Sequence, residues 1–325
     1  MRMRFILSIL KYWFRWFPKG FIYFGHGIGS TIKDPHIERI HLPTADLIYI
    51  LDFWQTLDFE FISMEKLIFI KDNKFKYHKP WIHLTFDDGY RNNLTDALQI
   101  LAERNIPFSV FVSTDMVAQN KRFDTFRIRT AVMFTKKEIN IPVISAHLEA
   151  QADDRTKKEF IYKISKAFKQ LNRKNAAEFM TSIEGLLSHE QWKEINEQYT
   201  NDAPLSVEEL SLLANHPLVY IGAHGVTHAI HNKHLEDHIR KEEIYGSKKW
   251  LEETLGKTID VFAFPNGNVD DIDETSINHC KEAGYQLVFT TIMDPINKNT
   301  DTFRIPRHYL STYPQFIVKF LSIKQ

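Results

Sequence analysis

The sequence predicts an α/β protein built on a parallel sheet, and three observations lead to that prediction. Short apolar runs that suit buried strands alternate with longer segments of helical periodicity, an alternation typical of parallel sheets covered by helices. The 325 residues, 43% of them hydrophobic, suffice for the core of one barrel-sized domain. Polar residues collect directly after several apolar runs, where parallel barrels place catalytic groups. The pattern leaves open whether the sheet closes into a barrel or stays open and doubly wound.

The elements can be placed one by one from apolar spacing and from turn and capping residues. In the first part we expect strands at 21–24, 59–62, 81–86 and 108–112, with helices at 45–57 and 94–104. In the last part we expect a helix opened by a capping box at 206–209, a charged helix at 235–255 with Gly256 as C-cap and a helix at 272–283. The strands expected there are 218–221, 261–264, 286–290 and one near 303–305.

The middle and the ends of the chain differ from this pattern. Residues 115–203 are rich in Lys and Glu and poor in strand signals, so we interpret them as a helical insertion that covers part of the substrate groove. Residues 1–19 are basic and aromatic, and fit either a helix packed on the barrel exterior or an interfacial helix in peripheral contact with a membrane. They lack the apolar run of a secretory leader or of a membrane span, which leaves cytoplasmic and membrane-associated locations open. We expect residues 313–325 to form a C-terminal helix.

Charge and cysteine content exclude some classes of protein. Lys+Arg and Asp+Glu both number 41, so the formal net charge is zero and no overall field favours nucleic acid. Cys280 is the single cysteine, which excludes an internal disulfide framework and a Cys-rich metal site.

The first chemical signal is Thr-Phe-Asp-Asp-Gly at residues 85–89, at the end of an apolar run. Two adjacent carboxylates are costly to bury unless a positive group pairs with them, and a divalent metal is the usual solution. One carboxylate can ligate the metal while the other takes a proton from water. The structural alternative is an Asp-Asp-Gly turn that caps the next helix.

The second signal is His224 and His228, four residues apart and again after an apolar run. Two such histidines can face one metal ion, although other histidines nearby also allow a chance pair. Combined with one of the aspartates, they give the two-imidazole, one-carboxylate set typical of catalytic zinc with an open position for water.

In these motifs the chain resembles the NodB-homology polysaccharide deacetylases, carbohydrate esterase family 4, over residues 21–310. The family has the Thr-Phe-Asp-Asp-Gly and His-x-x-x-His motifs, both intact here. Phe-Ala-Phe-Pro-Asn-Gly at 262–267 is similar to its Phe-Ala-Tyr-Pro-x-Gly segment, and Phe-Arg-Ile-Pro-Arg at 303–307 resembles an ending common in one branch. The resemblance implies a distorted (β/α)7 barrel with the helical insertion, spanning residues 20–312.

The resemblance also implies roles for individual residues. Asp87 would be the general base, and Asp88, His224 and His228 would hold a divalent metal, zinc first, with Ni²⁺, Co²⁺ and Mn²⁺ as alternatives. The branch that deacetylates poly-N-acetylglucosamine takes its acid from a His after the first strand, which here is His26, in Gly-His-Gly where that branch has Tyr-His-Arg.

For the general acid and for the arginine that orients the base, the resemblance leaves more than one candidate residue. The competing acid is His308, the nearest late histidine. The usual base-orienting arginine motif is not recognisable, and the substitutes are Arg127, Arg129, Arg304 and Arg307. We choose Arg307 and place it among the substrate-site residues with Phe264, Pro265 and Asn266.

The expected activity is hydrolysis of an acetamido group on a sugar, with release of acetate, by a hydrolase of linear amides other than peptides. Its partner would be a carbohydrate carrying N-acetyl groups. The alternatives are a deformylase or an O-acetyl esterase acting on a lipid-linked sugar, and a carbohydrate-binding homologue without catalysis.

Overall fold

The computed structural model describes residue 11, residues 20–294 and residues 296–311. The expected N-terminal segment 1–19, apart from Lys11, and the expected C-terminal helix 313–325 lie outside the described residues. Among the described residues, no helix has both the length and the apolar character that crossing a membrane requires.

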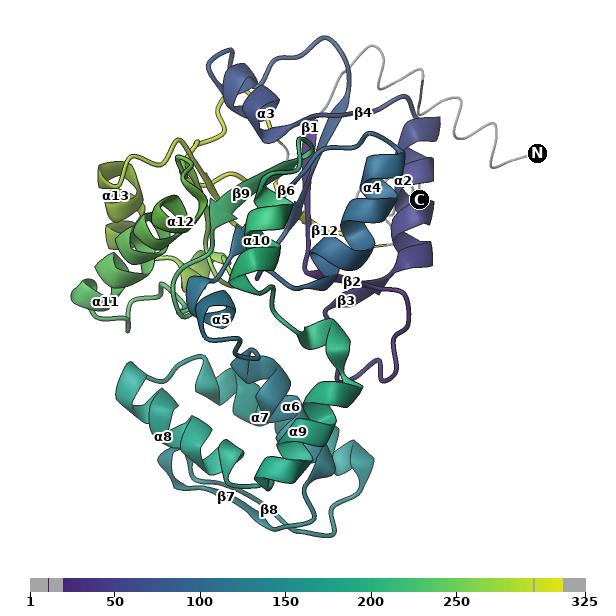
Figure 1. Cartoon of the computed structure of the whole chain (residues 1–325). Coiled ribbons are helices and arrows are strands. Elements are labelled where there is room, and N and C mark those ends of the chain that lie inside the picture. The colour runs from purple at the N-terminus through teal and green to yellow at the C-terminus, as the bar shows by residue number, and fades with distance from the viewer. Residues whose placement is uncertain (1–10, 12–19, 295, 312–325) are drawn as a thin grey trace, which may run out of the picture.

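A parallel sheet forms the centre of the molecule, with the strand order β11-β10-β9-β6-β5-β1-β12 and with β4 attached beside β5 (Figure 1). Its strands are β1 (Gly20–Gly25), β4 (Glu60–Phe61), β5 (Trp81–Phe86), β6 (Phe108–Val112), β9 (Val219–Ala223), β10 (Val261–Ala263), β11 (Leu287–Phe289) and β12 (His308–Tyr309). The expected strands 81–86 and 108–112 are confirmed at both bounds.

The two edges of the sheet are joined by the segment 302–310. Val288 donates its amide to Thr302 O, and Ile305 donates to Val288 O, so the first part of this segment lies along β11. Its second part, β12, pairs in parallel with β1. The seven strand positions therefore close into the distorted (β/α)7 barrel that the family resemblance implied. The final strand was expected near 303–305; that prediction was wrong, because these residues make only a single bridge to β11 and the ladder forms at 308–309.

Apolar side chains fill both sides of the sheet because successive residues of a strand point to opposite faces. One cluster, including Trp54, Leu84 and Phe86, lies between the strands and the helices. Another gathers alternate residues of the same strands, including Ile22, Trp81 and Phe111, inside the barrel.

The helices surround this sheet (Figure 1). They are α2 (Thr44–Thr56), α3 (Met64–Lys71), α4 (Leu98–Glu103), α5 (Thr114–Ala118), α10 (Val207–Ala214), α11 (Asp237–Lys241), α12 (Ser247–Leu255) and α13 (Glu274–Glu282). A π-helical turn, η1 (Asn93–Ala97), precedes α4, and a second, η4 (Glu242–Gly246), connects α11 with α12. The capping box of Ser206 and Glu209 and the left-handed C-cap Gly256 are confirmed.

The chain between β6 and α10 forms a separate lobe, drawn below the barrel in Figure 1. Its helices are α6 (Asp124–Phe134), α7 (Asp154–Phe168), α8 (Arg173–Glu184) and α9 (His189–Gln198). It has its own apolar cluster, which includes Phe126, Ile164 and Phe179. The lobe also contains an antiparallel hairpin of β7 (Ile139–Ile141) and β8 (Ala146–Leu148), which the sequence pattern does not predict, since strands of three residues leave little periodic signal.

Candidate active site

Asp88, His224 and His228 lie together at the carboxyl ends of β5 and β9. Nε2 of each histidine lies 3.4 Å from Asp88 Oδ1. One ligand atom from each of the three residues falls within 4.8 Å of the others. Asp88 Oδ1 is buried and accepts no well-formed hydrogen bond from the described part of the chain. The donor set and the unsatisfied carboxylate oxygen both fit a divalent cation.

A hydrogen bond at Nδ1 fixes the orientation of the His224 ring. Its Nδ1 lies 2.7 Å from the carbonyl oxygen of Ala263, the last residue of β10. A ring nitrogen in that contact donates its proton, which leaves the Nε2 lone pair, on the side of Asp88, free to bind a cation.

The two loops that carry these residues adopt left-handed backbone conformations. Asp88 has φ 81° and His228 has φ 63°. Such conformations cost about 1–3 kcal/mol for residues other than glycine and persist where the surroundings impose them. The backbone strain is therefore located at two of the three candidate ligands.

Glu243 holds the loop between the two histidines, a role that sequence reasoning missed. Its buried carboxylate accepts hydrogen bonds from the amides of Val226 (2.8 Å) and Thr227 (3.0 Å) and from the Thr227 hydroxyl (2.6 Å). A Cβ on Gly225, whose φ is 81°, would lie 2.6 Å from Glu243 Oε2, so the close approach requires glycine. The available signal was helical spacing, because position 243 lies on the same face as Ile239, four residues earlier.

The lobe contacts both metal-site loops through its ends. At its start, Ser113 donates its amide to Asp88 O, and the next two amides donate to Gly225 O and Val226 O. At its end, Leu205 donates its amide to Gly89 O. The lobe is therefore attached to the barrel at the loops that carry Asp88 and His228.

Asp87 is paired with Arg307. Nη1 and Nη2 of Arg307 donate to the two Asp87 carboxylate oxygens at 2.7 and 2.8 Å. Nη1 also donates to Thr85 Oγ1 at 3.0 Å, and Nε donates to Thr290 O at 3.0 Å. The guanidinium lies inside the barrel, over the Phe24 ring at 4.9 Å, and Arg307 has no exposed surface. Four of its five N–H donors thus have partners in the protein, which suits orientation of Asp87 rather than direct contact with a substrate.

These contacts set the protonation of the aspartates. Burial alone would raise the pKa of Asp87, but the Arg307 guanidinium outweighs it and holds that pKa below its usual value. Burial opposes ionisation of Asp88 too, and the two imidazoles beside it hold its pKa well below the usual value. Both carboxylates are ionised at neutral pH.

His26 follows β1 directly, and the charges of Asp88, Asp87 and the two histidines of the site act on it. Burial lowers its pKa, and the charges of Asp88 and Asp87 act in the opposite direction. Among the residues that the structure describes, none forms a hydrogen bond with its buried Nδ1 atom. The competing residue, His308, is in β12, where its ring packs against Phe21 at 5.7 Å and Tyr23 at 5.9 Å. Phe21 and Tyr23 both belong to the cluster between the strands and the helices.

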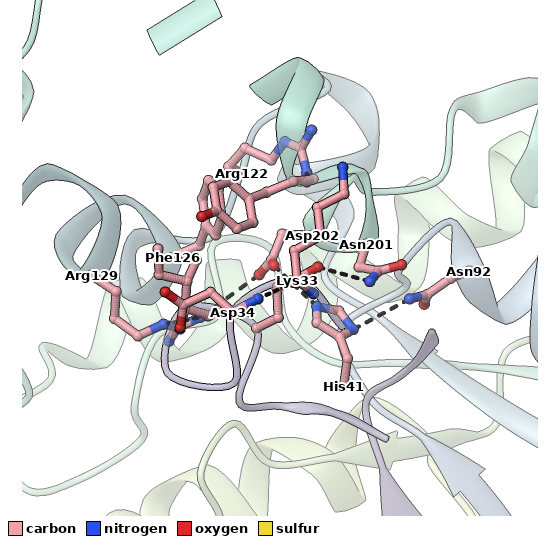
Figure 2. Close-up of polar contacts among 12 residues, drawn as sticks. Lys33, Asp34, His41, Asn92, Arg122, Phe126, Arg129, Asn201 and Asp202 are labelled. Atoms are coloured by element: carbon pink, nitrogen blue, oxygen red, sulfur yellow. Dashed lines mark hydrogen bonds and ion pairs between the residues drawn. The ribbon is translucent and has the colours of Figure 1, made fainter. Parts of the chain in front are cut away.

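The other arginines considered as base partners contact different carboxylates. Arg127 pairs with Asp124, and Arg304 pairs with Asp301. Arg129 lies at a buried junction between the lobe and the barrel (Figure 2).

At that junction, Arg129 Nη2 lies 3.7 Å from Asp202 Oδ1, and His41 Nε2 lies 3.2 Å from Asp202 Oδ2 (Figure 2). The Asp202 and His41 side chains have no exposed surface and that of Arg129 has almost none. Arg129 Nε also donates to Ile37 O at 2.8 Å. These contacts attach the lobe to the barrel, and none of them involves Asp87.

The three residues expected around the sugar differ in their burial. Phe264 has no exposed surface, and its ring packs against Phe262 and His231 in the core. Pro265 is buried as well. Asn266, with φ 58°, lines the cavity beside His228. Of these three residues, Asn266 alone reaches the cavity.

Comparison with known proteins agrees with this arrangement. The sequence profile of the polysaccharide deacetylase family matches residues 74–288, which include Asp87, Asp88, His224 and His228. Comparison with curated protein sequences finds no match.

Solved structures share the fold at low sequence identity. The deacetylase PplD of Streptococcus pyogenes, solved in complex with acetate, is 14% identical with a TM-score of 0.58, covering 93% of this chain and 97% of that one. IcaB from Ammonifex degensii is 14% identical with a TM-score of 0.59, covering 94% and 96%. A de-N-acetylase from Aggregatibacter actinomycetemcomitans is 13% identical with a TM-score of 0.55, covering 93% and 99%. Because the family profile matches more than half of the sequence, this chain belongs to the polysaccharide deacetylase family and is a hydrolase of that class.

Proposed function

We propose that this chain hydrolyses the acetamido group of an amino-sugar glycan with one divalent metal ion held by Asp88, His224 and His228. The observation that carries the proposal is the convergence of three ligand atoms within 4.8 Å beside a separate, arginine-held carboxylate. Two imidazoles and a carboxylate leave coordination positions free, as in catalytic zinc sites. Zinc is our first choice, with Ni²⁺, Co²⁺ or Mn²⁺ as alternatives. When bound, the metal would supply a Lewis acid for the acetyl carbonyl and increase the acidity of a water molecule.

Asp87 acts as the general base in this proposal. Arg307 occupies one position on each carboxylate oxygen, and an ionised carboxylate has about four acceptor positions, so Asp87 can still take a proton from the attacking water. The guanidinium keeps the carboxylate ionised and fixes its plane. Neither residue needs to move to begin the reaction.

His26 acts as the general acid. The departing amine needs a proton, and His26 can supply it once it is protonated; burial lowers its pKa, and the charges of Asp88 and Asp87 oppose that shift. The support is its place after β1 and the unpaired Nδ1. Acetate and a free amino sugar are the products. The lobe of residues 115–203 would cover part of the groove and shape the chain-length preference.

The test is a panel of matched substrates with N-acetyl, N-formyl and O-acetyl groups, incubated with zinc-loaded protein. We expect acetate from the N-acetyl glycan, and no release by an Asp87→Asn variant. Release of formate alone, or of acetate from the O-acetyl substrate alone, would show that the reaction is a deformylation or an ester hydrolysis. Binding without release from every substrate would indicate a carbohydrate-binding protein.

A further inference from the structure

A cavity of about 290 Å³ lies between the lobe and the barrel, directly beside the candidate metal site. The lobe contributes residues from 121–125 and 168–176, and the barrel contributes residues from 227–239 together with Asn266. His228 is part of the lining, and the ring of Phe123, also in the lining, packs edge-on against it at 5.5 Å. The volume is at the small end of ligand pockets, which suits one sugar unit and its substituent.

The cations that line this cavity differ in their partners. Lys121 Nζ lies 3.9 Å from Asp124 Oδ1, and Arg173 Nη1 lies 3.2 Å from Glu242 Oε2. Lys169 instead donates to the neutral side chain of Asn266, with Nζ 2.6 Å from Oδ1. Among the residues that the structure describes, no carboxylate forms an ion pair with Lys169.

Lys169 is an exposed residue, and burial of part of its side chain and two charged groups act on its ammonium. Burial lowers its pKa, Asp271 acts in the opposite direction without forming an ion pair, and the charge of Arg39 lowers the pKa further. Arg39 is exposed and likewise has no ion pair within the described part of the chain. Besides Asp124, the carboxylate of Asp115 lines the cavity. Asp115 lies in the first turn of α5, where the helix dipole favours a carboxylate.

We propose that this cavity is a subsite for an anionic substituent of the glycan, a phosphate or a carboxylate, which Lys169 binds in place of Asn266. An anion replaces the neutral amide oxygen of Asn266 with a charged acceptor, which adds the attraction between opposite charges to the hydrogen bond. The inference rests on the proposed function, because it places the anionic group next to the sugar whose acetamido group reaches the metal site. The substrate is thus an acidic or phosphorylated amino-sugar glycan rather than a neutral homopolymer.

The experiment compares three N-acetyl oligosaccharides of equal length: one neutral, one with a phosphate and one with a carboxylate on the neighbouring unit. Wild-type protein should show a KM about tenfold or more lower for an anionic substrate than for the neutral one, since hydrogen bonds to charged groups are strong enough for that difference. The two anionic arms identify which group is preferred. In Lys169→Gln the KM ratio between anionic and neutral substrates should approach one, whereas Lys166→Gln, which changes an exposed lysine in the last turn of α7, should keep the wild-type ratio.

Equal KM values for neutral and anionic substrates in the wild type would overturn the subsite. Equal loss of the preference in the two lysine variants would also overturn it, because a general surface charge would then explain the effect. If no substrate releases acetate, the proposed function fails, and the subsite is decided by calorimetry of the same oligosaccharides. Tighter anion binding by wild-type protein than by Lys169→Gln would then support it, and equal binding would refute it.

Discussion

Replacement of Arg307 by Gln should lower the stability of the protein and raise the pKa of Asp87, the proposed general base. The guanidinium makes two hydrogen bonds of 2.7 and 2.8 Å to a carboxylate that is itself buried. Removing one partner of a buried ion pair costs about 3–5 kcal/mol, because the other charge stays in a medium of low polarity. Urea unfolding at pH 7 should show a loss of that size.

The effect on Asp87 follows from the sign of its pKa shift. Arg307 holds the pKa of Asp87 below its usual value, so the pair contributes stability above the unfolded pKa of 3.8 that is lost as the pH falls through the folded pKa. Without the arginine, burial raises the pKa of Asp87, and the acidic limb of the pH–rate profile should move to higher pH. The double variant Asp87→Asn/Arg307→Gln should recover part of the lost stability.

Arg304 is the matched control, because it is three residues away and partly exposed, and pairs with Asp301 and Glu274. Arg304→Gln should cost less than about 1 kcal/mol, as exposed ion pairs usually do. If Arg307→Gln unfolds at the same urea concentration as wild type and keeps its pH–rate profile, the assignment of Arg307 as the residue that orients the base is wrong.

Three further predictions concern histidines and Glu243. His26→Ala should retain the metal and lose activity about 10²–10⁴-fold, as loss of a general acid does, while His308→Ala stays near wild type; the opposite result in kcat would transfer the acid role to His308. Glu243→Gln should weaken metal binding about 10–100-fold in a chelator competition, as changes behind metal ligands do, and should alter the visible spectrum of the cobalt-loaded protein; an unchanged affinity and spectrum would leave Glu243 no positioning role. Burial lowers the pKa of His83 to about 4 and of His231 to about 3, so below pH 6.5 the unfolded state binds protons that the folded state does not. The free energy of unfolding should therefore fall toward pH 4 by up to about 1.4 kcal/mol per pH unit for each histidine. In urea unfolding, His83→Gln should reduce this dependence on pH, and an unchanged dependence would contradict the shift.

Much of the barrel could be predicted because its strands are buried on both faces and bounded by polar turns. All six residues of β5 are buried, and four of them, Trp81, Ile82, Leu84 and Phe86, are large apolar residues that mark the strand clearly. The closing segment was harder to place. Residues 303–305 have the composition of a strand, but the paired residues of β12 begin only after Arg307, whose buried side chain turns inward to Asp87.

The candidate metal ligands could be predicted from their spacing in the sequence. Residues whose role depends on tertiary contacts were harder to predict. Asp88, His224 and His228 could be grouped because each follows a strand and parallel strands bring their carboxyl ends together. The expected sugar-pocket role of Phe264 assumed a side chain directed at the groove, whereas alternation along β10 directs it into the core. Helical spacing could place Glu243 on a buried face, but it could not identify the partners of Glu243, which lie 16 and 17 residues earlier in the chain.

The most direct test of this account is the metal content of the purified protein after dialysis, measured by elemental analysis for three forms. Wild type should retain about one equivalent of a divalent metal, because three ligand atoms converge at one buried point. His224→Ala/His228→Ala should retain none, and Asp87→Asn should retain most of it while releasing no acetate. Equal metal content in wild type and the double histidine variant would contradict the site, and loss of metal from Asp87→Asn would show that the roles of the two aspartates are reversed.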